Sequence, residues 1–232
     1  MRAEAQTALH LAPHPDDEAL GAPAALLALR DAGWRVVDLA CGLGSAPGPR
    51  ERRRTEVVEA CRRAGFALRI AVSDDVAAEV TAALEDERPE LVISPDPGDV
   101  HPAHAAAGRA ARRAIELAPR SRARPRWWTW ALWAELRHPT LLVPFGGDRL
   151  AELEHVLAAH ASQLERNDFA TLLRARAELA RVRGPELVFG FGAPGIDEPY
   201  AELLTERTLD AGGGWRLGEP RRSAPRSAKH QP

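Results

Sequence analysis

Two short segments of this sequence carry side chains that could bind a metal ion and transfer protons. Residues 14–18 read His-Pro-Asp-Asp-Glu and supply one imidazole and three carboxylates. Residues 101–104 read His-Pro-Ala-His and supply two more imidazoles. A zinc ion takes imidazole and carboxylate ligands, and a carboxylate that stays free beside it can transfer protons. The two segments therefore suggest a metal site with a general base.

Both segments lie where a predicted strand passes into a predicted helix. Apolar residues 8–11 precede the first segment and residues 91–93 precede the second, and helical periodicity follows each. In an open α/β sheet, ligands bind beyond the carboxyl ends of the strands. We therefore expect the two segments to project from the same edge of one parallel sheet.

This placement predicts a shared ion. His101 and His104 are three residues apart on a first helical turn, so they point to the same side. We expect His14, Asp17 and one of these two histidines to form a ligand set with open positions, as in catalytic zinc sites. A simpler alternative is that Asp16 or Asp17 only caps the following helix. The pairing of two such segments at one sheet edge favours the metal.

The rest of the chain alternates predicted strands and helices. This pattern predicts an α/β fold, a Rossmann-like and mostly parallel sheet with helices on both faces. Residues 1–217 are expected to form a single domain, and the basic, Pro/Arg-rich residues 218–232 a disordered tail. Strands are expected at 34–41, 66–72, 127–133 and 141–143, helices at 19–31, 50–64, 75–87, 102–117, 150–161 and 169–182, and a short helix or turn at 200–204.

Composition limits the remaining possibilities. The chain has 232 residues, 45% of them hydrophobic, and a formal net charge of −2. This near-neutral balance gives no reason to expect a nucleic-acid or membrane partner. Cys41 and Cys61 have no metal-binding spacing, and no signal peptide is recognisable. We therefore expect a cytoplasmic protein.

Four other features could carry function. Gly42–Pro49 resembles a dinucleotide loop, but Pro47 takes the place of the third glycine. Cys41 could be a nucleophile, although its apolar surroundings favour an inert thiol. The tryptophans of 127–133 could stack on a sugar, although alternating aromatic residues in a strand are more often core. His160 could approach the site, but we expect it to support helix packing.

The ordered motifs resemble those of the PIG-L/LmbE-like metal-dependent N-deacetylases. The resemblance covers roughly residues 7–205. Its motifs are Pro-His-Pro-Asp-Asp-Glu at 13–18, Arg-Arg-Thr-Glu at 53–56, His-Pro-Ala-His at 101–104, Ala-His-Ala-Ser-Gln at 159–163 and Tyr-Ala-Glu at 200–202.

The resemblance implies a role for each residue at the predicted site. His14, Asp17 and His104 match the zinc ligands, with one Zn²⁺ expected per chain. Asp16 matches the general base that takes a proton from zinc-bound water. His101 matches the histidine that stabilises the oxyanion and protonates the leaving amine.

Two further positions qualify the resemblance. Arg53 lies where the family tends to place an arginine that contacts substrate. The aspartate of the family's His-Pro-Asp-His is Ala103 here. Because that position is not a zinc ligand, we expect weaker orientation of a histidine and no loss of metal.

The implied activity is zinc-dependent hydrolysis of a linear amide, the acetamide of an N-acetylated amino sugar or sugar conjugate. The partner is then a small molecule, and a homo-oligomer is compatible with this reading. Two alternatives stay open. One is metal-dependent hydrolysis of another bond such as a phosphoester, which would need a second metal ion. The other is a non-catalytic sugar- or nucleotide-binding relative.

Overall fold

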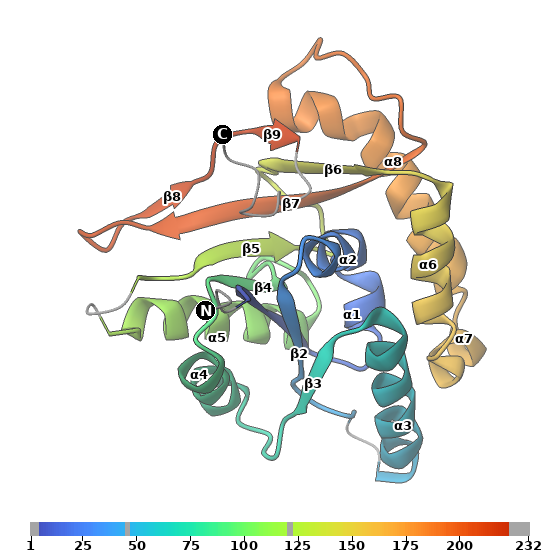
Figure 1. The fold of residues 1–232 in the computed structure, drawn as a ribbon, viewed down its shortest axis with the longest axis vertical. Helices are drawn as coiled ribbons and strands as arrows, with labels where there is room; N and C mark the ends of the chain where they lie inside the picture. Colours follow the sequence, from blue (N-terminus) through green and yellow to red (C-terminus); the bar gives the residue numbers. More distant parts are fainter. Residues whose placement is uncertain (1–4, 45–46, 120–122, 223–232) are drawn as a thin grey trace.

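The described residues of the chain form one mixed sheet. The computed structural model describes residues 5–44, 47–119 and 123–222 (Figure 1). These residues form a nine-stranded sheet of order β3-β2-β1-β4-β5-β7-β6-β9, with β8 paired to β7. The strands are β1 Thr7–Ala12, β2 Arg35–Ala40, β3 Ala67–Ile70, β4 Leu91–Pro95, β5 Arg126–Trp130, β6 Leu141–Phe145, β7 Tyr200–Leu209, β8 Trp215–Leu217 and β9 Arg221–Arg222.

The strand order places the two histidine segments next to each other. Strands β3, β2, β1, β4 and β5 run parallel in the order 3-2-1-4-5, which matches the first five strands of the Rossmann order 3-2-1-4-5-6. The strand order reverses between β1 and β4, the point where such sheets bind ligands. Because β1 and β4 are hydrogen-bonded neighbours, the loops that follow them emerge side by side.

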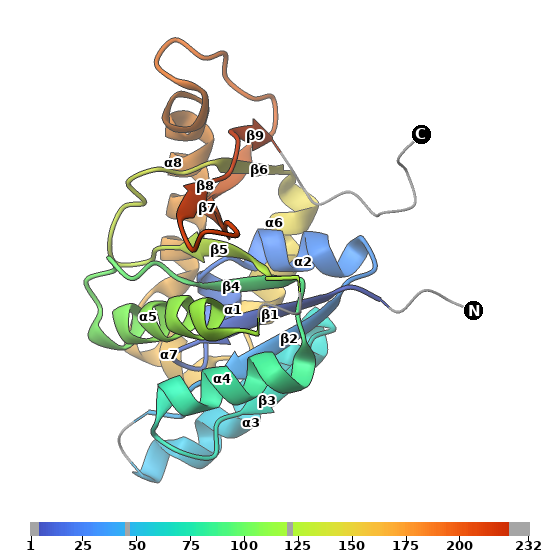
Figure 2. The ribbon, with the colours of Figure 1, turned by 90° about the vertical axis from the view of Figure 1, so that its left-hand side faces the viewer.

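Helices cover both faces of the parallel strands (Figures 1 and 2). One face packs against α1, α2, α3 and α6, and the other against α4 and α5. The helices are α1 Asp17–Leu20, α2 Pro23–Asp31, α3 Pro47–Ala64, α4 Val76–Glu87, α5 Pro102–Leu117, α6 Gly147–Leu157, α7 Ala161–Arg166 and α8 Phe169–Phe189. The predicted α/β class with a mostly parallel sheet is confirmed.

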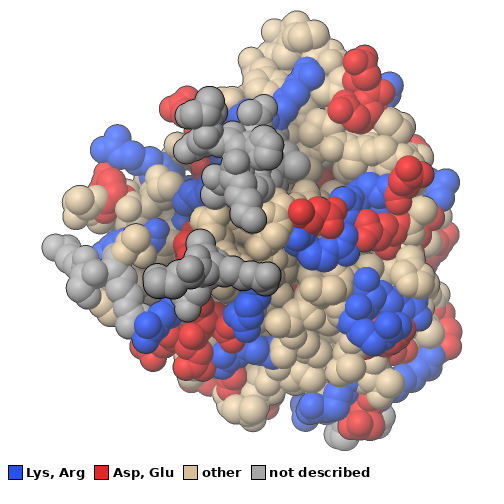
Figure 3. All heavy atoms as spheres, viewed as in Figure 1, with Lys and Arg blue, Asp and Glu red and all other residues tan. Residues whose placement is uncertain are grey.

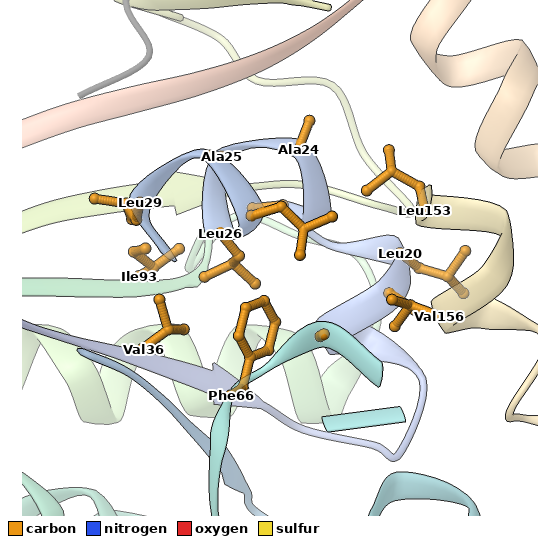
Figure 4. Packing of buried hydrophobic residues seen from close by; sticks show 14 of the residues in the cluster. Leu20, Ala24, Ala25, Leu26, Leu29, Val36, Phe66, Ile93, Leu153 and Val156 are labelled. Atoms are coloured by element: carbon orange, nitrogen blue, oxygen red, sulfur yellow. The ribbon is translucent and has the colours of Figure 1, made fainter. Parts of the chain in front are cut away.

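Alternating apolar residues build the larger core. In Figure 4, Leu26 of α2 points toward Val36 of β2, Ile93 of β4 and Phe66. Each of these side chains is at least nine-tenths buried, and burying one side chain of this size contributes about 1.5–3 kcal/mol. This core supports the strands whose ends carry the histidine segments.

Three sequence predictions are wrong. Residues 200–204 are not a helix or turn but the start of β7, which pairs antiparallel with both β5 and β6. The predicted helix over 19–31 is two helices, α1 and α2, separated at Gly21 and Ala22. The tail does not begin at residue 218, because β9 pairs with β6 and the Gly218 amide donates to the Glu206 carbonyl at 2.9 Å. Residues 223–232 lie outside the described part.

We expect Gly21→Ala to destabilise the fold. A Cβ atom at Gly21 would lie 2.5–2.8 Å from three ring atoms of the buried Trp130. Overpacking of this kind costs about 1–3 kcal/mol, so the free energy of unfolding measured in urea should fall by that amount. Gly195→Ala is the matched control, because no atom lies within 4 Å of its added Cβ. Equal stability of the two variants would contradict the close approach.

Charge is dispersed over the visible surface. Figure 3 shows acidic and basic side chains interspersed on one face of the molecule. None of the helices in the described ranges is long and apolar enough to cross a membrane.

Candidate metal centre

The turn after β1 has a backbone that its sequence would not normally adopt. Asp16 has φ = 123°, a region that costs a non-glycine residue of order 1–3 kcal/mol and that is common at functional sites. Its side chain makes no capping hydrogen bond to α1. Asp17 instead folds back, and its Oδ2 accepts a hydrogen bond from the His14 amide at 2.8 Å. Capping therefore does not account for Asp16.

The two histidine segments meet at Asp17. Its Oδ2 lies 3.3 Å from His14 Nδ1, and its Oδ1 lies 3.4 Å from His104 Nε2. His101 completes the group, because the ligand atoms of the three histidines all lie within 4.8 Å of one another. The structure thus brings together residues that are 90 positions apart in the sequence.

These separations fit a tetrahedral zinc ion. With metal–ligand bonds of about 2.0–2.2 Å, two ligand atoms of such an ion lie roughly 3.3–3.5 Å apart. Neither Asp17–histidine pair is aligned as a hydrogen bond in the described structure, although both lie within ion-pair distance. The donor set of two imidazoles and a carboxylate suits a borderline divalent metal. His14, Asp17 and His104 are therefore able to hold the predicted ion, and their role as ligands stays a prediction.

The charges of the cluster favour ligation by Asp17. Burial works against ionisation, but the adjacent His104 and His14 outweigh it and hold the pKa of Asp17 well below its usual value. For His104, burial is again opposed, here by Asp17 and Asp99, and its pKa rises to about 9. Asp17 is therefore a carboxylate at neutral pH, the form that binds a metal.

Asp16 and His101 have the opposite electrostatic character. Burial and the neighbouring Asp17 raise the pKa of Asp16 well above its usual value, whereas His160 and Arg53 act in the other direction. Burial and then His14 lower the pKa of His101. Of the arginines near the start of α3, Arg53 is the half-buried one, and its effect on Asp16 places its charge close to the site. The catalytic and substrate-binding roles of these residues stay predictions.

Asp99 is a site residue that the sequence interpretation missed. It is 4% exposed, and its Oδ2 lies 3.5 Å from His104 Nδ1. The same oxygen accepts hydrogen bonds from the amides of Leu132 and Trp133 at 2.9 and 3.2 Å, and Oδ1 accepts one from the His101 amide at 2.9 Å. A carboxylate behind a ligating histidine is the usual outer-shell partner of a zinc site.

We expect Asp99→Asn to weaken metal binding about 10–100-fold, because an outer-shell partner sets the tautomer and orientation of its histidine. Titration of the chelated protein with zinc, read by competition with a chromophoric chelator, measures this change. The exposed Asp148 gives the control Asp148→Asn, which should bind zinc like the unchanged chain. An unchanged zinc affinity in Asp99→Asn would show that Asp99 only stabilises the loop that contains Leu132 and Trp133.

Ala103 supplies no carboxylate to the neighbouring histidines. His101 Nδ1 and His104 Nδ1 are buried and have no hydrogen-bond partner among the described residues. This is consistent with the expected loss of orientation at a position where the family's motif has an aspartate. The three histidines still lie together, so the substitution does not disperse the cluster.

The late motif residues support the site from behind. His160 Nε2 contacts Glu18 Oε1, and both side chains are fully buried. Glu56 of α3 accepts a hydrogen bond from the Ser162 amide at 2.7 Å. Glu202 accepts hydrogen bonds from the amides of Ala24 and Ala25 at the start of α2. These contacts hold the helices around the first histidine segment.

The remaining candidates are not among the clustered ligand-type side chains, although the Trp130 ring packs edge-on against the His104 ring at 5.3 Å between centroids. Trp127, Trp128 and Trp130 are core residues, and Trp133 is 41% exposed in the loop after β5. Cys41 is buried, and burial raises the pKa of its thiol above the usual value, so it is inert at neutral pH. The Gly42–Pro49 segment runs into α3 at Pro47, and its residues 45–46 lie outside the described part.

Comparison with known proteins gives a family match over part of the chain and a shared fold. Residues 9–115 match the PIG-L family, described as GlcNAc-PI de-N-acetylase. No curated protein sequence matches the chain.

Several solved structures share this fold. The conserved protein TT1542 from Thermus thermophilus is 28% identical, with 85% of this chain and 92% of that chain covered and a TM-score of 0.67. The N,N'-diacetylchitobiose deacetylase from Pyrococcus horikoshii is 20% identical, with 88% and 84% covered and a TM-score of 0.67. The 4-carboxy-2-hydroxymuconate hydratase GalB from Pseudomonas putida is 16% identical, with 87% and 95% covered and a TM-score of 0.68.

Proposed function

We infer that this chain belongs to the PIG-L/LmbE-like deacetylases, because the PIG-L family matches residues 9–115, and we propose that it is a metal-dependent N-deacetylase. The proposed substrate is a small molecule with an N-acetylated amino sugar. The proposed metal is one zinc ion per chain, held by His14, Asp17 and His104. A cytoplasmic location is also proposed, in keeping with two cysteines that form no disulfide.

The arrangement around Asp17 is the observation that carries this proposal. The fold alone does not determine the reaction, since the hydratase GalB shares it. The site is more specific, because it combines converging metal-type ligands with a separate buried carboxylate, Asp16, whose pKa is raised by burial and by Asp17. A general base works best when its pKa lies near the working pH.

The residues divide the work of amide hydrolysis. A bound zinc ion supplies Lewis acidity and lowers the pKa of water to about 7. The Asp16 carboxylate takes one proton from the attacking water. His101 donates an N–H hydrogen bond to the carbonyl oxygen as negative charge develops there, an interaction worth roughly 3–4 kcal/mol. The proton that Asp16 has taken from water then passes by way of His101 to the leaving nitrogen. Arg53 contacts substrate beside Asp16. The products are a free amine and acetate.

A release assay tests the proposal. Zinc-loaded and chelated protein would be incubated with a panel of N-acetylated amino sugars, and primary amine and acetate would be measured in parallel. We expect equal amounts of amine and acetate from at least one substrate with zinc, a loss of release on chelation, and its return on adding zinc. No release from any substrate by the zinc-loaded protein would contradict deacetylation.

The alternatives give different results in the same samples. Phosphoester hydrolysis needs two metal ions about 3.5–4 Å apart, whereas the described residues offer a single histidine group. One zinc per chain by elemental analysis, with no phosphate release, would speak against it. A non-catalytic relative would bind the sugars and release no amine, whether or not Asp16 is replaced.

A further inference from the structure

We propose that a hollow beside the metal centre binds an alkyl or aryl group attached to the amide-bearing sugar, so that the preferred substrates are amphiphilic. This inference rests on the proposed function and narrows its substrate class. The hollow has a volume of about 420 Å³ and lies between the loop 131–136, α8 and the start of β7. Small-molecule sites occupy roughly 300–1,000 Å³.

Apolar side chains from all three elements form its walls. The wall residues that matter here are Leu132, Trp133, Leu179, Ala180 and Leu203. Trp133 and Leu179 are 41% and 50% exposed. Large apolar side chains left in water together around a concave surface are typical of a ligand site and uncommon elsewhere on a surface.

The polar groups at the base of the hollow are already satisfied. Arg176 donates hydrogen bonds to the carbonyls of Leu20 and Ala131, and Glu202 accepts from two amides of α2. Neither is therefore directed at a charged ligand. The two other charged residues of the lining, Arg183 and Glu135, pair with each other at 2.7 Å. The rest of the lining is mainly apolar, and this favours a hydrocarbon group over a phosphate or a second sugar.

The hollow borders the metal centre through one carboxylate. Asp99 Oδ2 binds the amides of the wall residues Leu132 and Trp133 and also lies 3.5 Å from His104 Nδ1. Strand β7 runs antiparallel to β5, so its first residues, 201–203, lie at the sheet edge where β1 and β4 end. Figure 2 shows the chain between β5 and β6 running along that side of the molecule toward α8. A group attached close to the reacting amide is thus able to reach the hollow across Trp133.

Two substrate series distinguish the sources of the hydrocarbon. One compares methyl with octyl glycosides of N-acetylglucosamine, below the critical micelle concentration. The other compares N-acetyl with N-octanoyl groups on the methyl glycoside. Each buried methylene contributes roughly fourfold to binding, and burial is partial, so we expect one series to show an about 10–100-fold lower KM for the octyl member. Equal KM values within both series would overturn the proposal.

Variants that fill the hollow provide the second test. Ala180→Phe should reduce the octyl preference to less than about threefold, and Leu179→Gln, at a half-exposed position, should reduce it without filling the space. Ala175→Phe is the matched control, since Ala175 is an exposed residue of α8 outside the hollow. A preference that persists in both Ala180→Phe and Leu179→Gln would overturn the assignment to this hollow.

Direct binding separates this inference from the proposed activity. Octyl N-acetylglucosaminide should bind the chelated protein in calorimetry, and Ala180→Phe should abolish the binding. If the octyl glycoside binds to the unchanged chain but not to Ala180→Phe, and no substrate releases amine, the deacetylase proposal is contradicted. The assignment of the hollow as an alkyl-binding site is then still supported. If the octyl glycoside does not bind and sedimentation shows an oligomer that Ala180→Phe dissociates, a second copy of the chain covers the hollow and the proposal is overturned.

Discussion

We expect Asp16→Asn to lower the rate of the proposed deacetylation by about 10²–10⁴-fold while the zinc content of the protein stays unchanged. The reason is that asparagine keeps the shape of Asp16 but cannot accept a proton, and a positioned general base typically contributes this factor. Asp16 is 6% exposed, and its backbone is held at φ = 123° beside the proposed ligands. Amine release and elemental analysis of the same preparation measure the two quantities.

A matched control separates this effect from a general effect of lost charge. Asp86 is exposed and forms an ion pair with Arg69 at 2.9 Å, away from the cluster. Asp86→Asn should therefore keep both rate and zinc. If Asp16→Asn kept more than half of the rate, Asp16 would not be the base. If it lost zinc, it would have to be counted among the ligands.

We expect His104→Ala to remove the proposed metal and with it the proposed activity. His104 is 1% exposed, and its two nitrogens face Asp17 and Asp99. Loss of a proposed ligand should weaken zinc binding by more than the 10–100-fold typical of an outer-shell partner, so that dialysed protein retains almost no zinc. The variant should also be less stable by about 3–5 kcal/mol, because two buried carboxylates lose their cation.

His155→Ala is the corresponding control, because His155 is exposed on α6. It should retain one zinc per chain and the full rate of amine release. A folded His104→Ala protein with unchanged zinc content would contradict the ligand role. In that case His14 and His101 of the same histidine group would be the ligands to test next.

The parallel half of the sheet could be predicted because its signals are local. Each of its strands is a short apolar run followed by a helical pattern, and connections of this kind are right-handed and parallel. Strand β7 was missed because its apolar residues Ala201, Leu203 and Leu204 do not alternate strictly with polar ones, as they would in a half-buried strand. The partners of its glutamates are distant in sequence: Glu202 binds amides of α2, and Glu206 accepts from Trp128 Nε1 at 2.5 Å.

At the site, too, contacts between neighbouring segments could be predicted from the sequence, whereas contacts between distant residues could not. The placement of His14, Asp17 and His104 together could be predicted, since the motifs follow neighbouring parallel strands. Asp99 could have been suspected, because an acidic residue two positions before His101 lies in the same turn. Glu18 contacts His160, which lies 142 residues later in the sequence. The two residues belong to separate motifs, and neither motif indicates that they are in contact. The sequence motifs therefore could not predict that Glu18 contacts His160.

Anomalous diffraction from zinc-loaded crystals, collected on both sides of the zinc absorption edge, tests the central claim most directly. The account predicts one strong peak per chain, within bonding distance of His14, Asp17 and His104, with the Asp16 carboxylate beside it and not bonded to it. A peak at any other place, or none at these three side chains in zinc-saturated protein, would contradict it.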